Sequence, residues 1–462
     1  MALSLASMSV ESHAPVAEAD RSRSLDVLRG VAVLGILVMN SRNFALPLQQ
    51  FDNPAFPGQA GSPARRADLW SWGVANVLFE DKMIAILSML FGAGIVLGGA
   101  RAVREARAAI VHYRRMFWLL VIGLLHAYGL WYGDILNTYA ICGMAIYPVR
   151  RARPAVLICL GVLVLSVAIF VRVGPRVMDV VSAPAATAAP TNTAGAGATQ
   201  AATESPAASA TPSTSPAAAA RESRSDRIWR VSLAEEQAAY QGSWWNLATW
   251  RARLNTLWHF DGGITFSFWR CGGFILIGMG LVQLGLLTGT AQRSTYWSLI
   301  LAGYGVGLAL MLVGFWPQLT RTLGRSPQMS PEARTLVGSM AWTLRYAAAG
   351  GIALGHISVV MLLCQSRVAS PLLAPLAAVG RMALSCYLMH TLVCIALFDG
   401  WALGQWGTWR MSQVAVLVGG IWITQLLICP IWLRLFLFGP AEWTWRSLTH
   451  WKLQPFMRRA TT

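Results

Sequence analysis

The residues of this chain best suited to chemistry are ionisable side chains inside long apolar stretches. His126 and Asp134 stand eight residues apart in the string GLLHAYGLWYGDILNTYAICG. A histidine exchanges protons near neutral pH, and a nearby carboxylate can orient its ring and stabilise the imidazolium. We therefore predict that His126 and Asp134 form a catalytic proton-transfer pair. A purely structural role for a buried histidine is the alternative.

Three consecutive charged residues, Glu80, Asp81 and Lys82, interrupt the apolar string LFEDKMIAILSMLFGAGIVLGGAR. Charges inside a membrane span are costly, so they face a protein interior or a water-filled cavity. The string predicts either a substrate-binding site inside the bundle or a kink close to the membrane surface. The glycines that follow are expected to allow close helix packing.

Asp26 and Arg29 occur in SLDVLRGVAVLGILVMN, three residues apart on one helical face, where they can form an ion pair. This pair either anchors the helix at the membrane surface or forms a site for an anionic group such as a phosphate, with Arg29 as donor. Asn40 ends the same stretch. It is expected either to join helices by hydrogen bonds or to act as a catalytic residue.

The second half of the chain adds Arg270, Arg381 and His390 as candidate substrate- or donor-binding residues in apolar surroundings. For His390, structural hydrogen bonding is an equal alternative. Glu442 and Arg446 are predicted to pair on a short interfacial helix. The strings carry no P-loop, Ser-His-Asp or metal-ligand signature, so we expect neither a metal site nor a bound cofactor.

The elements that position these residues follow from composition. Of 462 residues, 55% are hydrophobic and only 12% are charged, and the mean hydropathy is +0.49. Apolar runs of about 20 residues are what a bilayer core about 30 Å thick requires. We predict an all-α, polytopic membrane bundle with about ten spans, near residues 26–43, 70–99, 116–132, 135–149, 155–172, 264–287, 294–316, 338–364, 371–398 and 412–437.

The third and fourth predicted spans are the shortest, because Tyr132, Gly133 and Asp134 interrupt the apolar run between them. A broken or re-entrant hairpin is the alternative there, and nine to eleven spans are consistent with the sequence. Three arginine-rich segments fall on one side of a ten-span arrangement, which places both termini in the cytoplasm. They hold Arg101, Arg104, Arg107, Arg114 and Arg115; Arg150, Arg151 and Arg153; and Arg446, Lys452, Arg458 and Arg459.

One loop, with Arg321, Arg325 and Arg334, would lie on the opposite side. The formal net charge of +17 comes mostly from arginines in short loops beside apolar segments, as cytoplasmic retention requires. It therefore does not indicate a nucleic-acid partner.

Composition changes along the chain predict six segments. They are a polar cytoplasmic N-terminus (1–24), a transmembrane half (25–175), a disordered extracytoplasmic Ala/Pro/Ser/Thr linker (176–223), an interfacial amphipathic segment (224–263), a second transmembrane half (264–450) and a basic cytoplasmic tail (451–462).

Several strings, in chain order, resemble the YeiB-type family of bacterial inner-membrane proteins, whose C-terminal half is a domain of unknown function. They are LDVLRGVAVLGILVMN, LFGAGIVLGGAR, GLLHAYGLWYGDILNTYAICG, RCGGFILIGMGL, GRMALSCYLMHT and FGPAEWTWRSLT. The resemblance covers nearly the whole chain apart from the linker. It implies a multi-pass protein of a bacterial inner membrane, with membrane lipids as its surroundings.

The opening motif also resembles that of the heparan-alpha-glucosaminide N-acetyltransferase group, multi-span enzymes that use cytoplasmic acetyl-CoA to acetylate a sugar on the far side. In that group an asparagine ending the first span, matched here by Asn40, works with a histidine a short distance beyond. Residues 41–58 of this chain contain no histidine. We therefore expect His126, with Asp134, to serve as the base.

Two functions remain as expectations. As an acyltransferase, the protein would use acyl-CoA as co-substrate, bind its phosphates through Arg29 with Lys82 or Arg101, and acylate an extracytoplasmic glycan or lipid-linked sugar. As a proton-coupled transporter, it would use Glu80, Asp81, His126 and Asp134 as a relay. A non-catalytic membrane scaffold is a third interpretation.

Overall fold

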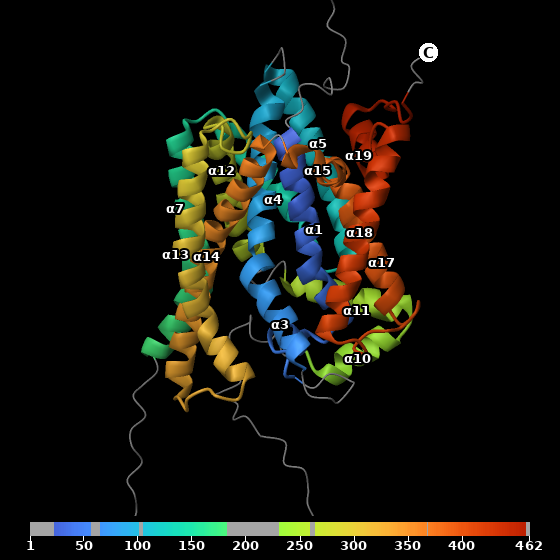
Figure 1. Ribbon diagram of the computed structural model, residues 1–462. Helices are drawn as coiled ribbons and strands as arrows, with labels where there is room; N and C mark the ends of the chain where they lie inside the picture. The colour runs from blue at the N-terminus through green and yellow to red at the C-terminus, as the bar shows by residue number, and fades with distance from the viewer. Residues whose placement is uncertain are drawn as a thin grey trace, which may run out of the picture.

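The computed structural model describes residues 23–56, 65–100, 105–182, 231–258, 264–366 and 368–458. Throughout this part the chain is helical, and its one β-type contact is an isolated bridge between Phe436 and Met457. Figure 1 shows the long helices standing side by side in one bundle. The predicted all-α helical bundle is confirmed.

The first half of the described chain contains a π-helix, a 3-10 turn and several α-helices. In order they are α1 (Arg23–Ala45), α2 (Leu48–Asp52), α3 (Arg66–Val74), the π-helix η2 (Ala75–Phe79), α4 (Lys82–Ala100), α5 (Glu105–Gly129), α6 (Leu136–Ile146), the 3-10 turn η3 (Tyr147–Val149) and α7 (Pro154–Ser182).

The second half begins with two short helices and continues with long ones. They are α10 (Leu233–Gln241), α11 (Trp244–Trp258), α12 (Ile264–Gln283), α13 (Arg293–Thr322), α14 (Pro331–Gln365), α15 (Ala369–Leu372), α16 (Ala374–Arg381), α17 (Ala383–Phe398), α18 (Met411–Leu435) and α19 (Pro440–His450).

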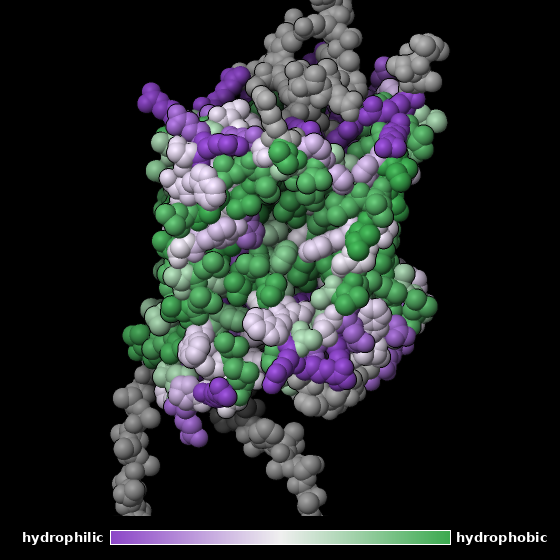
Figure 2. Space-filling model, in the orientation of Figure 1, coloured by the Kyte–Doolittle hydropathy of each residue, from purple (hydrophilic) through white to green (hydrophobic). Residues whose placement is uncertain are grey.

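Eight helical segments in the described residues are long and apolar enough to cross a membrane, and the bent pair α16 and α17 makes a ninth. On the face of the bundle shown in Figure 2, apolar side chains form a belt between polar ends, as lipid contact requires. The predicted span at 135–149 is α6 with η3, and α6 has only 11 residues, about 16 Å of helix. The interruption at residues 132–134 therefore produces a short return helix rather than a full span.

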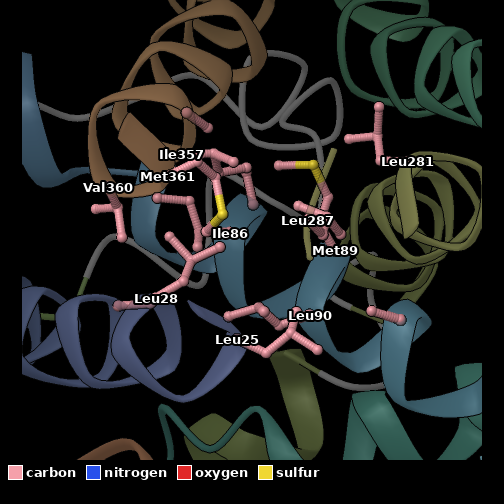
Figure 3. Close-up of a cluster of buried hydrophobic side chains, with 14 of the residues drawn as sticks. Leu25, Leu28, Ile86, Met89, Leu90, Leu281, Leu287, Ile357, Val360 and Met361 are labelled. Carbon is pink, nitrogen blue, oxygen red and sulfur yellow. The ribbon is translucent and has the colours of Figure 1, made fainter. Parts of the chain in front are cut away.

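The centre of the bundle is a cluster of buried aliphatic side chains from α1, α4, α12 and α14 (Figure 3). Helix α1 is buried on nearly every side. Gly30 and Gly380 lie where two helix backbones approach closely. A Cβ on either residue would lie 2.1 Å or less from a carbonyl oxygen of the facing helix. Gly92 is equally close to α12, as predicted, whereas Gly94 and Gly98 face open space.

The two ends of the bundle differ, and we name them the tail face and the cap face. The tail face, at the top of Figure 1, carries α19 and the start of α5, where the Arg115 guanidinium lies 4.5 Å from the Trp445 ring. The cap face, at the bottom, is covered by α10 and α11. The Arg114–Arg115 and Arg446 segments thus share one face, as the predicted topology requires, and the loop between α13 and α14 lies on the other.

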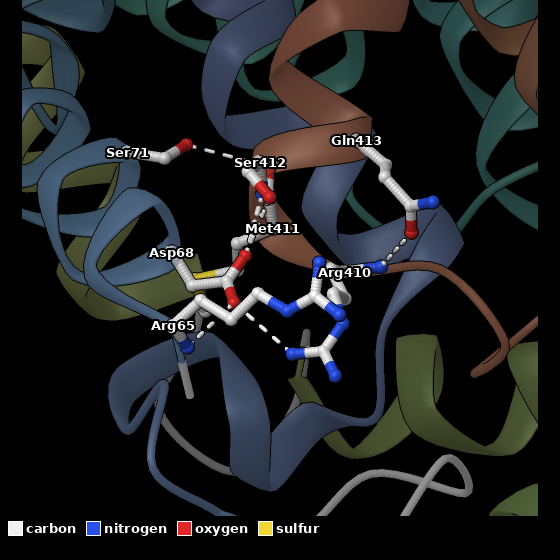
Figure 4. Close-up of polar contacts among 7 residues, drawn as sticks. All are labelled: Arg65, Asp68, Ser71, Arg410, Met411, Ser412 and Gln413. Carbon is white, nitrogen blue, oxygen red and sulfur yellow. Dashed lines mark hydrogen bonds and ion pairs between the residues drawn. The ribbon is translucent and has the colours of Figure 1, made fainter. Parts of the chain in front are cut away.

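Asp68 joins two helix starts at the cap face (Figure 4). Its carboxylate accepts hydrogen bonds from the backbone of Arg65, at the start of α3, and from the backbone N–H and hydroxyl of Ser412, at the start of α18. A carboxylate at two helix N-termini satisfies otherwise unpaired N–H groups and stabilises both helix dipoles. Asp68 therefore holds the cap-face ends of α3 and α18 together.

Two predicted boundaries change. Helix α7 continues to Ser182, so residues 176–182 are helical rather than part of the linker, and the remainder of the predicted linker lies outside the described residues. The predicted interfacial segment contains α10 and α11, whose inner sides are buried against the bundle: Leu247 and Tyr240 are each 1% exposed. The side chains of Trp244 and Trp245 are exposed, as an interfacial helix would predict.

Candidate functional site

The structure brings His126 and Asp134 together and adds a hydroxyl to them. His126 Nδ1 lies 2.9 Å from Asp134 Oδ1, and His126 Nε2 lies 2.9 Å from Thr391 Oγ1. The carboxylate accepts from Nδ1–H, which leaves Nε2 to accept the hydrogen bond that the Thr391 hydroxyl donates. All three side chains are buried. The result is a hydroxyl, an imidazole and a carboxylate in a row.

Local structure fixes the Asp134 side of this triad. Helix α5 ends at Gly129, the chain turns through residues 130–135, and Asp134 Oδ2 then accepts the N–H of Asn137 in the first turn of α6. Tyr387 Oη lies 3.4 Å from Asp134 Oδ1. Gly133 is required in this turn because a Cβ there would lie 2.3 Å from the Trp131 ring. The YGD interruption is thus a turn that aims Asp134 at His126.

Thr391 comes from α17, four residues after Tyr387, so both face the same side of that helix. Thr391 is not among the residues predicted from the sequence, because a threonine in an apolar span carries no chemical signal of its own. Only its distance from His126 identifies it. His390, the adjacent predicted residue, faces elsewhere: its Nε2 lies 3.0 Å from Gln425 Oε1 of α18.

The ring of Trp131 lies beside the triad and carries an unused hydrogen-bond donor. Its centroid is 6.3 Å from that of the His126 ring, and Trp131 Nε1 is buried without a hydrogen-bond partner in the described part of the chain. A buried N–H without a protein partner is available to donate to a ligand. Trp131 also stacks on Phe44, one helical turn after Asn40, which is half-buried.

The cap covers this site from below through a buried ion pair. Arg251 of α11 contacts both carboxylate oxygens of Asp399 at 2.7 and 2.9 Å and also donates to the Leu130 carbonyl, in the turn that carries Asp134. Arg251 thereby joins α11, the end of α17 and the turn after α5. This residue was also missed in the sequence, where it belonged to a segment predicted to lie at the interface.

Glu236 is a buried ionisable residue in the cap. Both of its carboxylate oxygens lie near the Leu48 N–H, at 3.1 and 3.2 Å, and the residue is 1% exposed. Burial raises the pKa of Glu236 to about 8, because the charged form loses its hydration. Glu236 is therefore protonated through most of the neutral range.

The other predicted site residues fall into two places. Glu80, Asp81 and Lys82 form the break between η2 and α4, where Asp81 is 2.5 Å from Arg270.

Asp26 and Arg29 form the predicted ion pair at 2.8 Å, and Arg29 also reaches the carbonyl of Gly380, beside Arg381. Gly35 packs against Met83, so the break lies about 9 Å further along α1 than Arg29. Lys82 and Arg29 therefore do not share one anion site, and Arg101 lies outside the described residues.

Glu442, in the first turn of α19, contacts the start of α17. Its carboxylate accepts from the backbone N–H groups of Leu384 and Ser385 and from the Ser385 hydroxyl, so it caps the start of α17. Helix α17 carries Thr391, and Glu442 thus helps to fix the position of that hydroxyl. No group of three or more metal-binding side chains occurs in the described residues.

Comparison with known proteins supports the sequence resemblance. Residues 281–452 match the family described as "Protein of unknown function (DUF418)". The chain is similar to the uncharacterized protein YeiB of Escherichia coli (strain K12), with 27% identity over 449 residues that cover 93% of this chain and 96% of YeiB. It is also similar to the uncharacterized protein YxaH of Bacillus subtilis (strain 168), with 26% identity over 453 residues that cover 96% and 98% of the two chains. The predicted resemblance to the YeiB type is confirmed.

Proposed function

We propose that this chain of the YeiB type, with a DUF418 region in its C-terminal half, is a transmembrane acyltransferase of the bacterial inner membrane. It transfers an acyl group from cytoplasmic acyl-CoA to an extracytoplasmic sugar or lipid-linked acceptor. The observation that carries this proposal is the row Thr391, His126, Asp134, with 2.9 Å at each of its two contacts. A hydroxyl, a histidine and a carboxylate in this order form an activated nucleophile in unrelated acyl-transfer enzymes.

In the first step, Thr391 Oγ1 attacks the thioester carbonyl while its proton passes to His126 Nε2. The carbon–sulfur bond then breaks, and the thiol leaves with the proton that His126 returns. Asp134 orients the imidazole and stabilises its charged form. The product of this step is an ester between Thr391 and the acyl group.

In the second step, His126 takes a proton from the acceptor hydroxyl or amine, which attacks the Thr391 ester. Thr391 Oγ1 leaves and regains the proton from His126. Both steps pass through a negatively charged oxygen, which needs hydrogen-bond donors near the reacting carbon. We assign this role to Trp131 Nε1, which is buried without a partner among the described residues, and to the Asn40 amide, one helical turn from the Phe44 ring that stacks on Trp131.

The test of this function is transfer of labelled acetyl from acetyl-CoA by the purified full-length protein in detergent, with membrane glycan extract as acceptor. Detergent removes any ion gradient, so turnover there separates enzyme from transporter. Label in a product that His126→Ala abolishes supports the proposal. Absence of both turnover and coenzyme binding with every extract rejects it.

One observation favours transport as a second candidate function. The span formed by α3 and α4 is broken at Glu80 and Asp81, level with the middle of α1, and carries charged side chains there. Broken helices near the bilayer midplane hold substrates and coupling ions in many transporters. Gradient-dependent uptake into proteoliposomes, without an acyl donor, is the result that favours this candidate.

A further inference from the structure

The break between η2 and α4 is built by specific side chains. Glu80 N–H donates to the Ala75 carbonyl, five residues back, and Lys82 N–H donates to the Glu80 carbonyl. The carbonyls of Asn76 and Leu78 therefore lose the partners that a regular α-helix would give them. Lys82 Nζ donates to the Asn76 carbonyl at 2.7 Å, and His356 Nε2 donates to the Leu78 carbonyl at 3.0 Å.

These contacts fix one ring proton of His356. A carbonyl can only accept, so Nε2 of His356 carries a proton and donates it to Leu78. His356 Nδ1 lies 2.8 Å from the Tyr304 hydroxyl. Arg345, whose guanidinium contacts Gln318 of α13, lies close enough to Lys82 to act on its charge.

Asp81 adds a strained backbone to this region. Its φ angle is 62°, in the left-handed region that residues with a Cβ adopt infrequently. This conformation turns the Asp81 carboxylate to Arg270, whose guanidinium lies 5.1 Å from the Phe266 ring. Strain of this kind persists where the surrounding structure requires it, and it is frequent at binding sites.

Three hydrogen-bond donors at the break are buried and unused. Arg270 Nε, Arg345 Nε and the Tyr346 hydroxyl have no partner in the part of the chain that the structure describes. Tyr346 is 5% exposed and lies close enough to Arg270 and Asp81 to feel their charges. Its ring stacks on Trp342 at 5.0 Å and packs against Phe266. A hydroxyl enclosed in this way normally has a hydrogen-bond partner.

We propose that the break between η2 and α4 is an anion-binding site that takes one carboxylate or phosphate group, held by Arg270, Arg345 and the Tyr346 hydroxyl. An anion satisfies the three unused donors. The aromatic rings of Phe266 and Trp342 suit an apolar group attached to that anion. The Asp81 and Arg270 side chains remain 29% and 13% exposed, so the site is not sealed. This proposal is independent of the acyl-transfer chemistry at His126.

The test is a thermal unfolding titration of the purified full-length protein in detergent at fixed ionic strength. One arm titrates phosphatidylglycerol against phosphatidylcholine, and the other titrates inorganic phosphate and acetate. Tyr346→Phe is the main variant, because it removes only a hydroxyl that has no protein partner and should leave the fold unchanged. Arg345→Gln is the second variant, and Arg321→Gln, an exposed arginine of α13, is the charge-matched control.

A saturable rise in Tm with phosphatidylglycerol or with a soluble anion is expected in the wild type and in Arg321→Gln. The first arm identifies a lipid headgroup as the source and the second identifies a free anion. The half-saturating concentration should increase about tenfold or more in Tyr346→Phe and Arg345→Gln, since each loses a hydrogen bond to a charged group. No saturable rise in either arm, or a rise with equal half-saturation in wild type and Tyr346→Phe, overturns the proposal.

Discussion

The hydroxyl of Thr391 lies 2.9 Å from Nε2 of His126, although the two residues are 265 positions apart in the chain. His126 belongs to the N-terminal half, and Thr391 belongs to the region that matches DUF418. The two halves of the protein therefore meet at the candidate catalytic site. The proposed activity requires both, and the DUF418 region alone has no base in this position.

Thr391 provides a direct test of covalent catalysis. Thr391→Ser keeps a hydroxyl beside His126 and should retain acyl transfer, whereas Thr391→Val keeps the shape and should reduce it by about 100-fold or more. Rapid quenching with labelled acetyl-CoA should trap label on the wild type and on Thr391→Ser. Equal activity in Thr391→Val and wild type would show that the hydroxyl is not the nucleophile.

Asp134→Asn should leave the fold intact but reduce the acyl-transfer rate. An amide at this position can donate to Nδ1, which favours the wrong tautomer of His126 and no longer stabilises its charged form. We expect a loss of about 100- to 10,000-fold in kcat at an unchanged Tm. Asp26→Asn, in the distant ion pair with Arg29, is the matched control. A comparable loss of kcat in Asp26→Asn would argue against a specific role for Asp134.

Glu236 predicts a pH dependence of stability with a defined sign. Its pKa is about 8 in the folded protein and lies near 4.5 when the carboxyl is exposed, so between these values the folded state holds a proton that the unfolded state has lost. The stability of the wild type should therefore fall as pH rises from about 5 to 8. The phenols of Tyr132 and Tyr240 lie close to this carboxyl but titrate at higher pH.

Glu236→Gln removes the titration and keeps a carbonyl oxygen that can accept the Leu48 N–H. Its Tm should equal that of the wild type near pH 5 and exceed it at pH 8, by the equivalent of several kcal/mol. The difference between the two proteins isolates this group from all others. A difference in Tm that is constant from pH 5 to pH 8 would contradict the assignment.

Gly380 tests the contact between α1 and α16. In Gly380→Ala the new Cβ would lie 1.8 Å from the Asp26 carbonyl oxygen, so the helices must separate. We expect a loss of about 1–3 kcal/mol or more, measured as a lower Tm in detergent. Gly94→Ala is the matched control, because nothing lies within 4 Å of its Cβ and alanine favours the helix. Equal Tm values for the two variants would show that the close approach is not needed.

The sequence predicted the helical membrane bundle because apolar spans are a strong, local signal. It also predicted the two pairs formed by residues near in sequence, His126 with Asp134 and Asp26 with Arg29. Thr391 and Arg251 were not predictable, since their partners come from distant parts of the chain. The short helix α6 was overestimated as a span, because hydropathy does not show where the turn after α5 lies.

Acyl transfer by this protein is tested with labelled acetyl-CoA and purified protein in detergent, comparing the wild type with His126→Ala and Asn40→Ala. We expect a labelled glycan or lipid product from the wild type, strong loss in both variants, and Tm values that show each variant is folded. Product formed at the wild-type rate by folded His126→Ala, or no coenzyme binding and no turnover by the wild type with any extract, would contradict the proposed function.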